Sequence, residues 1–81
     1  MHEYGDKINQ AVAAELRAQR ARVRISFDEL TERTGYAKTT VFNYLNGKRD
    51  IPIPALANIC QALDIRMDDV FVYALKAAEK D

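Results

Sequence analysis

The stretch from Ser26 to Gly47 reads SFDELTERTGYAKTTVFNYLNG and contains two short helical segments separated by a glycine. Ser26 followed three residues later by Glu29 forms a capping box, which predicts the start of a helix. Gly35 ends this helix, because glycine tolerates the left-handed conformation found after many helix C-termini. A second short helix is predicted over Lys38–Asn46, and two short helices around a tight turn indicate a helix-turn-helix. The residues expected to fix the angle between these helices are Leu30, Gly35, Tyr36, Val41 and Tyr44.

Apolar residues at helical spacing on both sides of this unit predict three further helices. They span about residues 6–23, 54–63 and 67–80, and residues 1–5 are expected to form a tail. The chain contains only three glycines and two prolines and lacks alternating apolar and polar runs, which favours helices over strands. No linker or internal repeat interrupts it. We therefore expect one all-α domain of five helices over residues 1–81.

The overall charge at first argues against a nucleic-acid partner, because twelve basic residues balance twelve acidic residues. The charges are nevertheless segregated along the chain. Residues 17–49 carry eight basic and three acidic residues, whereas residues 1–16 and 50–81 are both acidic. The predicted helix-turn-helix therefore lies in a segment with a net charge of +5.

Composition excludes several other classes of protein. No apolar run approaches the roughly 18 residues of a membrane span, and no basic, then apolar leader is present. Cys60 is the only cysteine and His2 the only histidine, so neither a thiol-based zinc site nor histidine-dependent catalysis is expected. We expect Cys60 to be a buried thiol, His2 a tail residue and Met67 a core or boundary residue. The sequence therefore predicts neither an enzyme nor a metal or cofactor site.

The stretch from Ser26 to Gly47 resembles the Cro/CI-type helix-turn-helix family, the phage-repressor-like bacterial regulators. Leu16–Arg20 is similar to that family's first helix, Pro54–Leu63 to its fourth and Asp68–Phe71 to the start of its fifth. The resemblance covers roughly residues 8–75. It implies a five-helix, lambda-repressor-like domain that binds operator double-stranded DNA and represses transcription in the bacterial cytoplasm or nucleoid.

The chain departs from that family's pattern at five positions. Phe27 replaces a glutamine that often contacts phosphate, and Thr31 replaces the small alanine at the helix crossing. Thr34 stands at an apolar position before the turn, and Arg24 stands where glycine is common. Ala37 replaces a serine-type cap. None of these changes breaks the fold, but Phe27 removes one expected phosphate contact.

The second helix of the unit has two faces, because successive residues are rotated by about 100°. One face is apolar, and the opposite face contains polar residues and one aromatic residue. The N-terminal end of this helix enters the major groove in helix-turn-helix proteins. There Asn43 can pair with adenine, Lys38 can donate to guanine, and a threonine can touch a thymine methyl group. We expect base contacts from Lys38, Thr39, Phe42 and Asn43, and phosphate contacts from Thr40 and Asn46.

Phe42 has two interpretations. Its ring either touches thymine methyl groups or sugar, or it is partly buried against the first or fourth helix. Lys48 and Arg49, which follow the helix, are predicted to bind phosphate. Arg17 and Arg24 are further candidates, although a basic run more often marks a solvated helix face.

The last helix carries a second apolar face. Val70, Phe71, Ala74, Leu75 and Ala78 form the stripe that one core can bury, which leaves Val72 and Tyr73 on the other side. A homodimer through Val72 and Tyr73 would read paired half-sites; the alternative is a monomer with two exposed residues. Phe42, Val72 and Tyr73 would instead contact protein if the chain were an antitoxin-like or other helical protein-interaction module. A fragment of a longer repressor is also compatible with the sequence.

Overall fold

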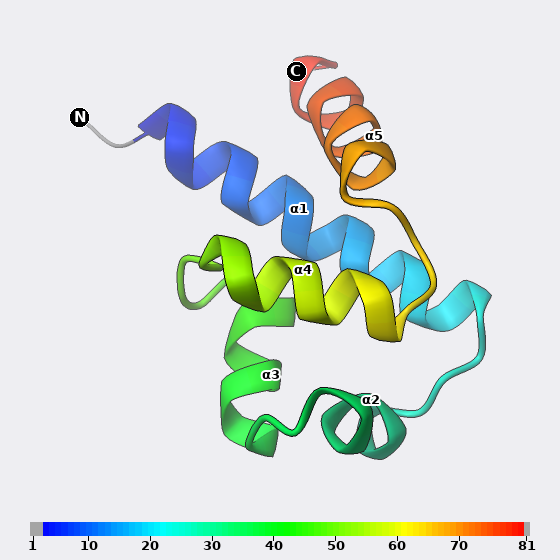
Figure 1. Cartoon of the computed structure of the whole chain (residues 1–81). Helices are drawn as coiled ribbons and strands as arrows, with labels where there is room; N and C mark the ends of the chain where they lie inside the picture. The colour runs from blue at the N-terminus through cyan, green and yellow to red at the C-terminus, as the bar shows by residue number, and fades with distance from the viewer. Residues whose placement is uncertain (1–2, 81) are drawn as a thin grey trace.

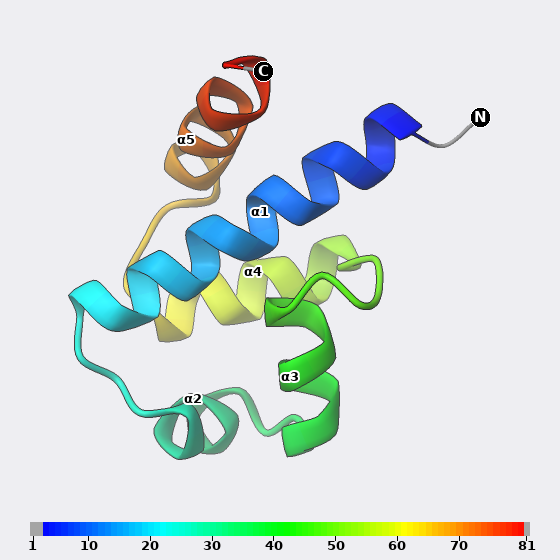
Figure 2. The same cartoon turned by 180° about the vertical axis from the view of Figure 1, so that it is seen from behind.

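The computed structural model describes residues 3–80, and their only regular elements are five helices (Figures 1 and 2). The predicted all-α class and the number of helices are therefore confirmed for this part of the chain. The helices are α1 (Glu3–Arg22), α2 (Phe27–Thr34), α3 (Lys38–Leu45), α4 (Ile53–Ala62) and α5 (Met67–Glu79).

Two predicted boundaries are wrong. Helix α1 begins at Glu3, so the expected tail over residues 1–5 is helical from its third residue. Acidic side chains in this first turn, Glu3 and Asp6, favour a helix start because they face the positive end of the helix dipole. Helix α4 begins at Ile53, which makes Pro54 its second residue rather than its first. The expectation for His2 lies outside the described residues.

Local signals explain the ends of α2. The Ser26 hydroxyl accepts a hydrogen bond of 3.0 Å from the backbone N–H of Glu29, as the capping box predicted. The Glu29 carboxylate instead pairs with Arg33 one turn later, so its side chain turns away from the helix start. At the other end, Gly35 adopts the left-handed conformation with φ 74°. The predicted start and stop of α2 are therefore both confirmed.

The five helices share one core. Helix α5 packs on α1, α2 packs on α4, and α3 contacts both α1 and α2. Each fully buried leucine or isoleucine stabilises the fold by about 1.5–3 kcal/mol through loss of apolar surface from water. The largest fully buried side chains are Leu16, Leu30, Ile59, Leu63, Val41, Val70 and Cys60. Every helix thus supplies at least one of the side chains that define the core.

Cys60 and Met67 lie where the sequence placed them. Burial in the core raises the pKa of the Cys60 thiol to about 11. Met67 is half-buried at the start of α5 and packs against the core. Both side chains therefore pack in or against the core, as the sequence predicted.

The turns after α1 and α4 contain non-glycine residues with a left-handed backbone. Arg24 has φ 57° and Asp64 has φ 56°. Such a conformation costs an ordinary residue roughly 1–2 kcal/mol, which fits the glycine that the resemblance implies at the position of Arg24. The Arg20 side chain donates a 3.0 Å hydrogen bond to the carbonyl of Ile25 and so braces the first of these turns.

Side-chain to backbone hydrogen bonds tie distant helices together. Gln19 of α1 is only 8% exposed and donates to the carbonyl of Leu63 at 3.0 Å. Arg33 of α2 donates to the carbonyl of Ala62 at 3.0 Å. The last carbonyls of α4, which have no partner within their own helix, are thereby satisfied by α1 and α2.

Candidate nucleic-acid interface

The residues predicted to fix the angle between α2 and α3 are buried or half-buried where the two helices meet, apart from Gly35 in the turn. Leu30 and Val41 are completely buried between the helices, and Tyr44 is nearly so. Tyr36 is half-buried in the turn, and its hydroxyl accepts a hydrogen bond of 2.8 Å from Asn58 of α4. The helix-turn-helix is therefore held both by apolar contact and by a bond to the neighbouring helix.

The unit lies at one end of the molecule, and α5 lies at the other (Figures 1 and 2). On α3, four of the predicted contact residues are exposed, and two are half-buried. Exposure decreases from the outer face toward the core, as the helical spacing predicted. The exposed residues are Lys38, Thr39, Phe42 and Asn46, and the half-buried ones are Thr40 and Asn43.

Lys38, at the start of α3, pairs with an acidic side chain of α2. Its Nζ lies 2.7 Å from Oδ1 of Asp28. Both side chains are largely exposed, at 66% for Lys38 and 73% for Asp28. The pair therefore bridges the two helices at their outer surface.

Phe42 is 46% exposed and packs against α2. Its ring meets that of Phe27 edge to face, with centroids 6.5 Å apart, and the Nζ of Lys48 lies 5.1 Å from its centroid. The ring's aromatic partner is therefore in α2, and the expected partial burial against the first or fourth helix stays a prediction. Phe27, which replaces the family's glutamine, thus supports an aromatic side chain on α3.

Lys48 and Arg49 are exposed in the loop that follows α3. The guanidinium of Arg49 lies 5.4 Å from the centroid of the Tyr44 ring. Such cation–π contacts restrain a long side chain while leaving its charge accessible to solvent. Both cations are therefore placed beside α3 in a restricted range of positions.

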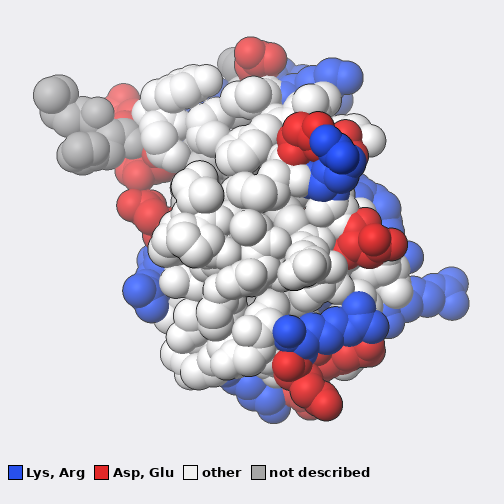
Figure 3. All heavy atoms as spheres, in the orientation of Figure 1, with Lys and Arg blue, Asp and Glu red and all other residues white. Residues whose placement is uncertain are grey.

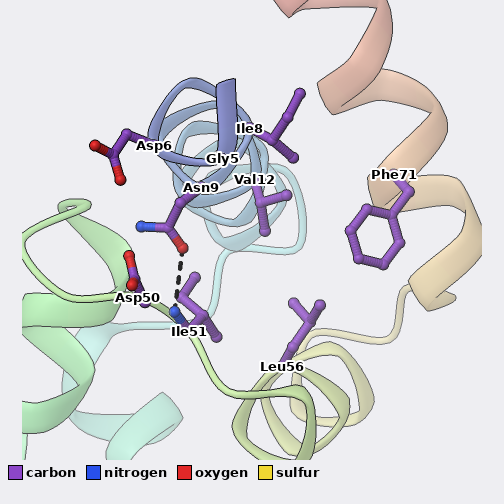
Figure 4. A pocket seen from close by; sticks show the side chains of 9 residues that line it. All are labelled: Gly5, Asp6, Ile8, Asn9, Val12, Asp50, Ile51, Leu56 and Phe71. Carbon is purple, nitrogen blue, oxygen red and sulfur yellow. Dashed lines mark hydrogen bonds between the residues drawn. The ribbon is translucent and has the colours of Figure 1, made fainter. Parts of the chain in front are cut away.

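Two amides of α1 hold this loop, and sequence reasoning missed both. Gln10 donates to the carbonyl of Gly47 at 2.6 Å, and Asn9 donates to the carbonyl of Arg49 at 3.1 Å. The Asn9 side chain also accepts from the backbone N–H of Ile51 at 3.1 Å, the bond drawn in Figure 4. In the sequence, only the position of these two amides on an otherwise amphipathic helix could have indicated their contact with the loop.

The arginine run of α1 divides into structural and exposed members. Arg17 donates to the carbonyl of Leu45 and so satisfies the C-terminal end of α3, and Arg20 donates to Ile25. Arg22 pairs with Glu15 at 3.0 Å. Arg24 is exposed in the turn before α2. Arg17 therefore has a structural role that the sequence did not reveal, and its phosphate contact stays a prediction.

Asn46, also expected to contact phosphate, ends α3. Its side-chain amide donates to the carbonyl of Phe42 at 2.8 Å. One amide hydrogen is thus used inside the helix, while the residue as a whole remains exposed.

The rest of the described surface contains a hollow but no group of side chains that could bind a metal ion. Figure 3 shows a broad uncharged face, with basic and acidic side chains next to one another around α2. A hollow of about 710 Å³ lies between α1, α5 and the start of α4, with an apolar lining and Asp6 and Asp50 at its edge (Figure 4). Among residues 3–80, no group of three or more His, Cys, Asp or Glu side chains could hold a metal ion. No helix in the same range has the length and apolar character needed to cross a membrane.

The second apolar face of α5 is exposed as the sequence predicted. Val72 is 46% exposed and Tyr73 is 50% exposed. Val70, Ala74 and Ala78 are buried on the opposite side, and Phe71 and Leu75 are half-buried.

Comparison with known proteins agrees with this geometry. No curated protein sequence matches the chain significantly. Among solved structures, the chain is similar to the clp gene regulator ClgR from C. glutamicum, with a TM-score of 0.82 and 26% sequence identity. The match covers 86% of this chain and 91% of that one. The family model for the Cro/C1-type helix-turn-helix DNA-binding domain matches residues 15–76. The chain therefore belongs to the family of Cro/C1-type helix-turn-helix DNA-binding domains.

Proposed function

We propose that this DNA-binding domain is a transcriptional repressor that occupies an operator and blocks polymerase. The observation that carries the proposal is the outer face of α3, which is polar, exposed and fixed by a buried contact with α2. A helix presented in this way can enter the major groove with its N-terminal residues toward base edges. The similarity to a gene regulator supports the same role.

Base reading is assigned to α3, from its first residue to Asn43. Lys38 donates to guanine, Asn43 pairs with adenine, and Thr39 bonds or touches a thymine methyl group. The exposed edge of Phe42 adds apolar contact with thymine methyl groups or sugar. Thr40 and Asn46 lie nearer the phosphates in this arrangement.

Phosphate binding is assigned to the cations beside α3. Lys48, Arg49 and Arg24 are exposed, whereas Arg20 bonds to a backbone carbonyl and Arg22 pairs with a carboxylate. Each phosphate contact contributes about 0.9 to the slope of log affinity against log salt. Because few cations remain available, nonspecific affinity is expected to be weak and specificity to depend on α3.

A homodimer is the proposed active form, with Val72 and Tyr73 of α5 at the contact between subunits. These residues are about half-exposed and lie at the end of the molecule away from α2 and α3. Two copies could then read half-sites about 34–36 Å apart. A monomer by sedimentation at high micromolar concentration, together with a Tyr73→Glu variant of unchanged operator affinity, would exclude the dimer.

Selection of bound sequences from a random duplex library tests the main proposal. The wild type should enrich one palindromic motif, and Asn43→Ala should lose the preference at one position while retaining the fold. Gln61→Ala, which changes an exposed amide near the C-terminal end of α4, is a matched control that should keep the motif. Failure of the wild type to enrich any motif at low salt contradicts the proposal.

A second candidate function is protein interaction of the antitoxin type. The half-exposed side chains of Phe42, Val72 and Tyr73 favour it, because exposed large apolar groups often mark contact surfaces. Steep salt dependence of binding to a palindromic duplex supports the DNA role. Unchanged DNA binding by Phe42→Ala, combined with lost binding to a purified protein partner, would favour the alternative for that residue.

A further inference from the structure

The ion pair between Asp28 and Lys38 joins the beginnings of α2 and α3 at the outer surface of the helix-turn-helix. Asp28 is the second residue of α2, and Lys38 is the first residue of α3, the end that enters the major groove. Exposed ion pairs contribute little to stability, about 0–1 kcal/mol, and Leu30 and Val41 already hold these helices together. Asp28 lies in the first turn of α2, where its negative charge favours the helix dipole, but this effect needs no contact with Lys38, so the pairing itself adds little to the fold.

A carboxylate at this place also opposes DNA binding in general. Its negative charge repels phosphate and so weakens affinity for every sequence alike. Any contribution of Asp28 to DNA binding must therefore come from distinguishing one sequence from another.

The pair offers a donor and an acceptor side by side. An ammonium group only donates hydrogen bonds, and a carboxylate only accepts them. In the major groove a G·C pair presents the guanine acceptors N7 and O6 next to the amino donor of cytosine. Guanine O6 and cytosine N4 are about 2.9 Å apart, as hydrogen-bonded partners, and the two protein atoms are 2.7 Å apart. The spacing and the order of the groups match.

We propose that Asp28 and Lys38 together read one G·C base pair: Lys38 donates to guanine, and Asp28 accepts from the cytosine amino group. This assignment rests on the proposed function. It makes Asp28, on the helix that precedes α3, a specificity-determining residue.

The assignment predicts a definite order of preference among the four base pairs at that position. A T·A pair keeps an acceptor facing Lys38 and a donor facing Asp28, but a methyl group takes the place of guanine N7. In C·G and A·T the donor and acceptor are exchanged, so both protein groups face groups of their own kind. The preference is therefore G·C, then T·A, with A·T and C·G bound most weakly.

The experiment measures affinity for four duplexes that differ only at this base pair. Selection with the wild type and with Lys38→Ala identifies the position, because Lys38→Ala loses the preference there. The wild type should bind the C·G duplex roughly 5- to 150-fold more weakly than the G·C duplex. Asp28→Ala should bind all four more tightly but lose most of that ratio, and Asp28→Asn should retain part of it through its remaining acceptor oxygen.

Glu32→Ala is the matched control, because it removes an exposed carboxylate from the same helix. It should change affinity for all four duplexes equally. Thermal melts of each variant confirm that the fold is retained.

An unchanged ratio between the four duplexes in Asp28→Ala, as in Glu32→Ala, overturns the assignment and leaves the proposed function intact. A wild-type order other than the one stated has the same consequence. Failure of the wild type to enrich any sequence overturns the proposed function and the assignment together.

Discussion

Replacing Gly47 with alanine tests how firmly the loop after α3 is held. Gly47 has φ 68°, and a Cβ added there would lie 2.2 Å from the Oε1 atom of Gln10. The same Gln10 side chain donates a hydrogen bond to the Gly47 carbonyl. The substitution therefore imposes a strained backbone conformation and displaces the side chain that ties the loop to α1.

The size of the effect follows from these two contributions. A left-handed conformation costs alanine about 1–2 kcal/mol, and loss of the Gln10 hydrogen bond costs about 0.5–1.5 kcal/mol. Gly35→Ala is a matched control, because Gly35 has φ 74° but open space where a Cβ would be added. Gly47→Ala should thus lower the free energy of unfolding by about 2–3 kcal/mol, roughly 1 kcal/mol more than Gly35→Ala.

Urea denaturation followed by circular dichroism measures both free energies of unfolding. Adding Gln10→Ala gives a double-mutant cycle, in which Gly47→Ala should cost less once the amide is gone. A Gly47→Ala variant no less stable than Gly35→Ala, or strictly additive free energies in the cycle, would refute the idea that Gln10 holds this loop.

Four further outcomes are expected. Lys48→Ala and Arg49→Ala should each reduce the slope of log affinity against log salt by about one unit, and slopes equal to the wild type would show that these residues do not bind phosphate. Phe42→Ala should keep a near-native melting temperature, because the ring is about half-exposed, but weaken operator binding; unchanged affinity would remove Phe42 from the interface. The Cys60 thiol should resist alkylation at pH 8 in the native state and react after unfolding, as mass spectrometry can follow. Burial raises the pKa of Cys60 from 9.0 to about 11, so between these pH values the thiol stays neutral in the folded chain but ionises in the unfolded chain. The free energy of unfolding should therefore fall as pH rises from 9 toward 11. A free energy of unfolding that stays constant over this range would contradict the burial of the thiol.

Much of the fold could be predicted because its signals are local. Ser26 and Gly35 mark the ends of α2 through groups within a few residues of each other. The buried and exposed faces of α3 follow from helical spacing alone, and the structure agrees with them. The start of α1 was misplaced because no capping side chain before Glu3 marks it in the sequence.

Contacts between distant residues could not be predicted in the same way. Gln10 and Gly47 are 37 residues apart, and Gln19 and Leu63 are 44 apart. A polar residue on a helix has the same appearance in sequence whether it faces water or a distant carbonyl.

The candidate site shows the same limit. The basic run made Arg17 a candidate for phosphate binding, but nothing in the sequence indicated that Arg17 and Arg20 satisfy backbone carbonyls. The pairs Asp28–Lys38 and Phe27–Phe42 depend on the angle between α2 and α3. The sequence predicts which residues set that angle, but not which surface side chains the angle brings together.

The bonds from Asn9 and Gln10 to the loop have a consequence for protein engineering. The stretch from Ser26 to Gly47, transplanted into another scaffold, would bring the exposed residues of α3 with it. It would leave behind the amides that orient Lys48 and Arg49, since these come from the first three turns of α1. A transplant that keeps the orientation of Lys48 and Arg49 must therefore include α1 and the residues up to Ile51 as well as the helix-turn-helix. Because α4 and α5 share the same core, the new scaffold must also cover the apolar faces that these two helices cover here.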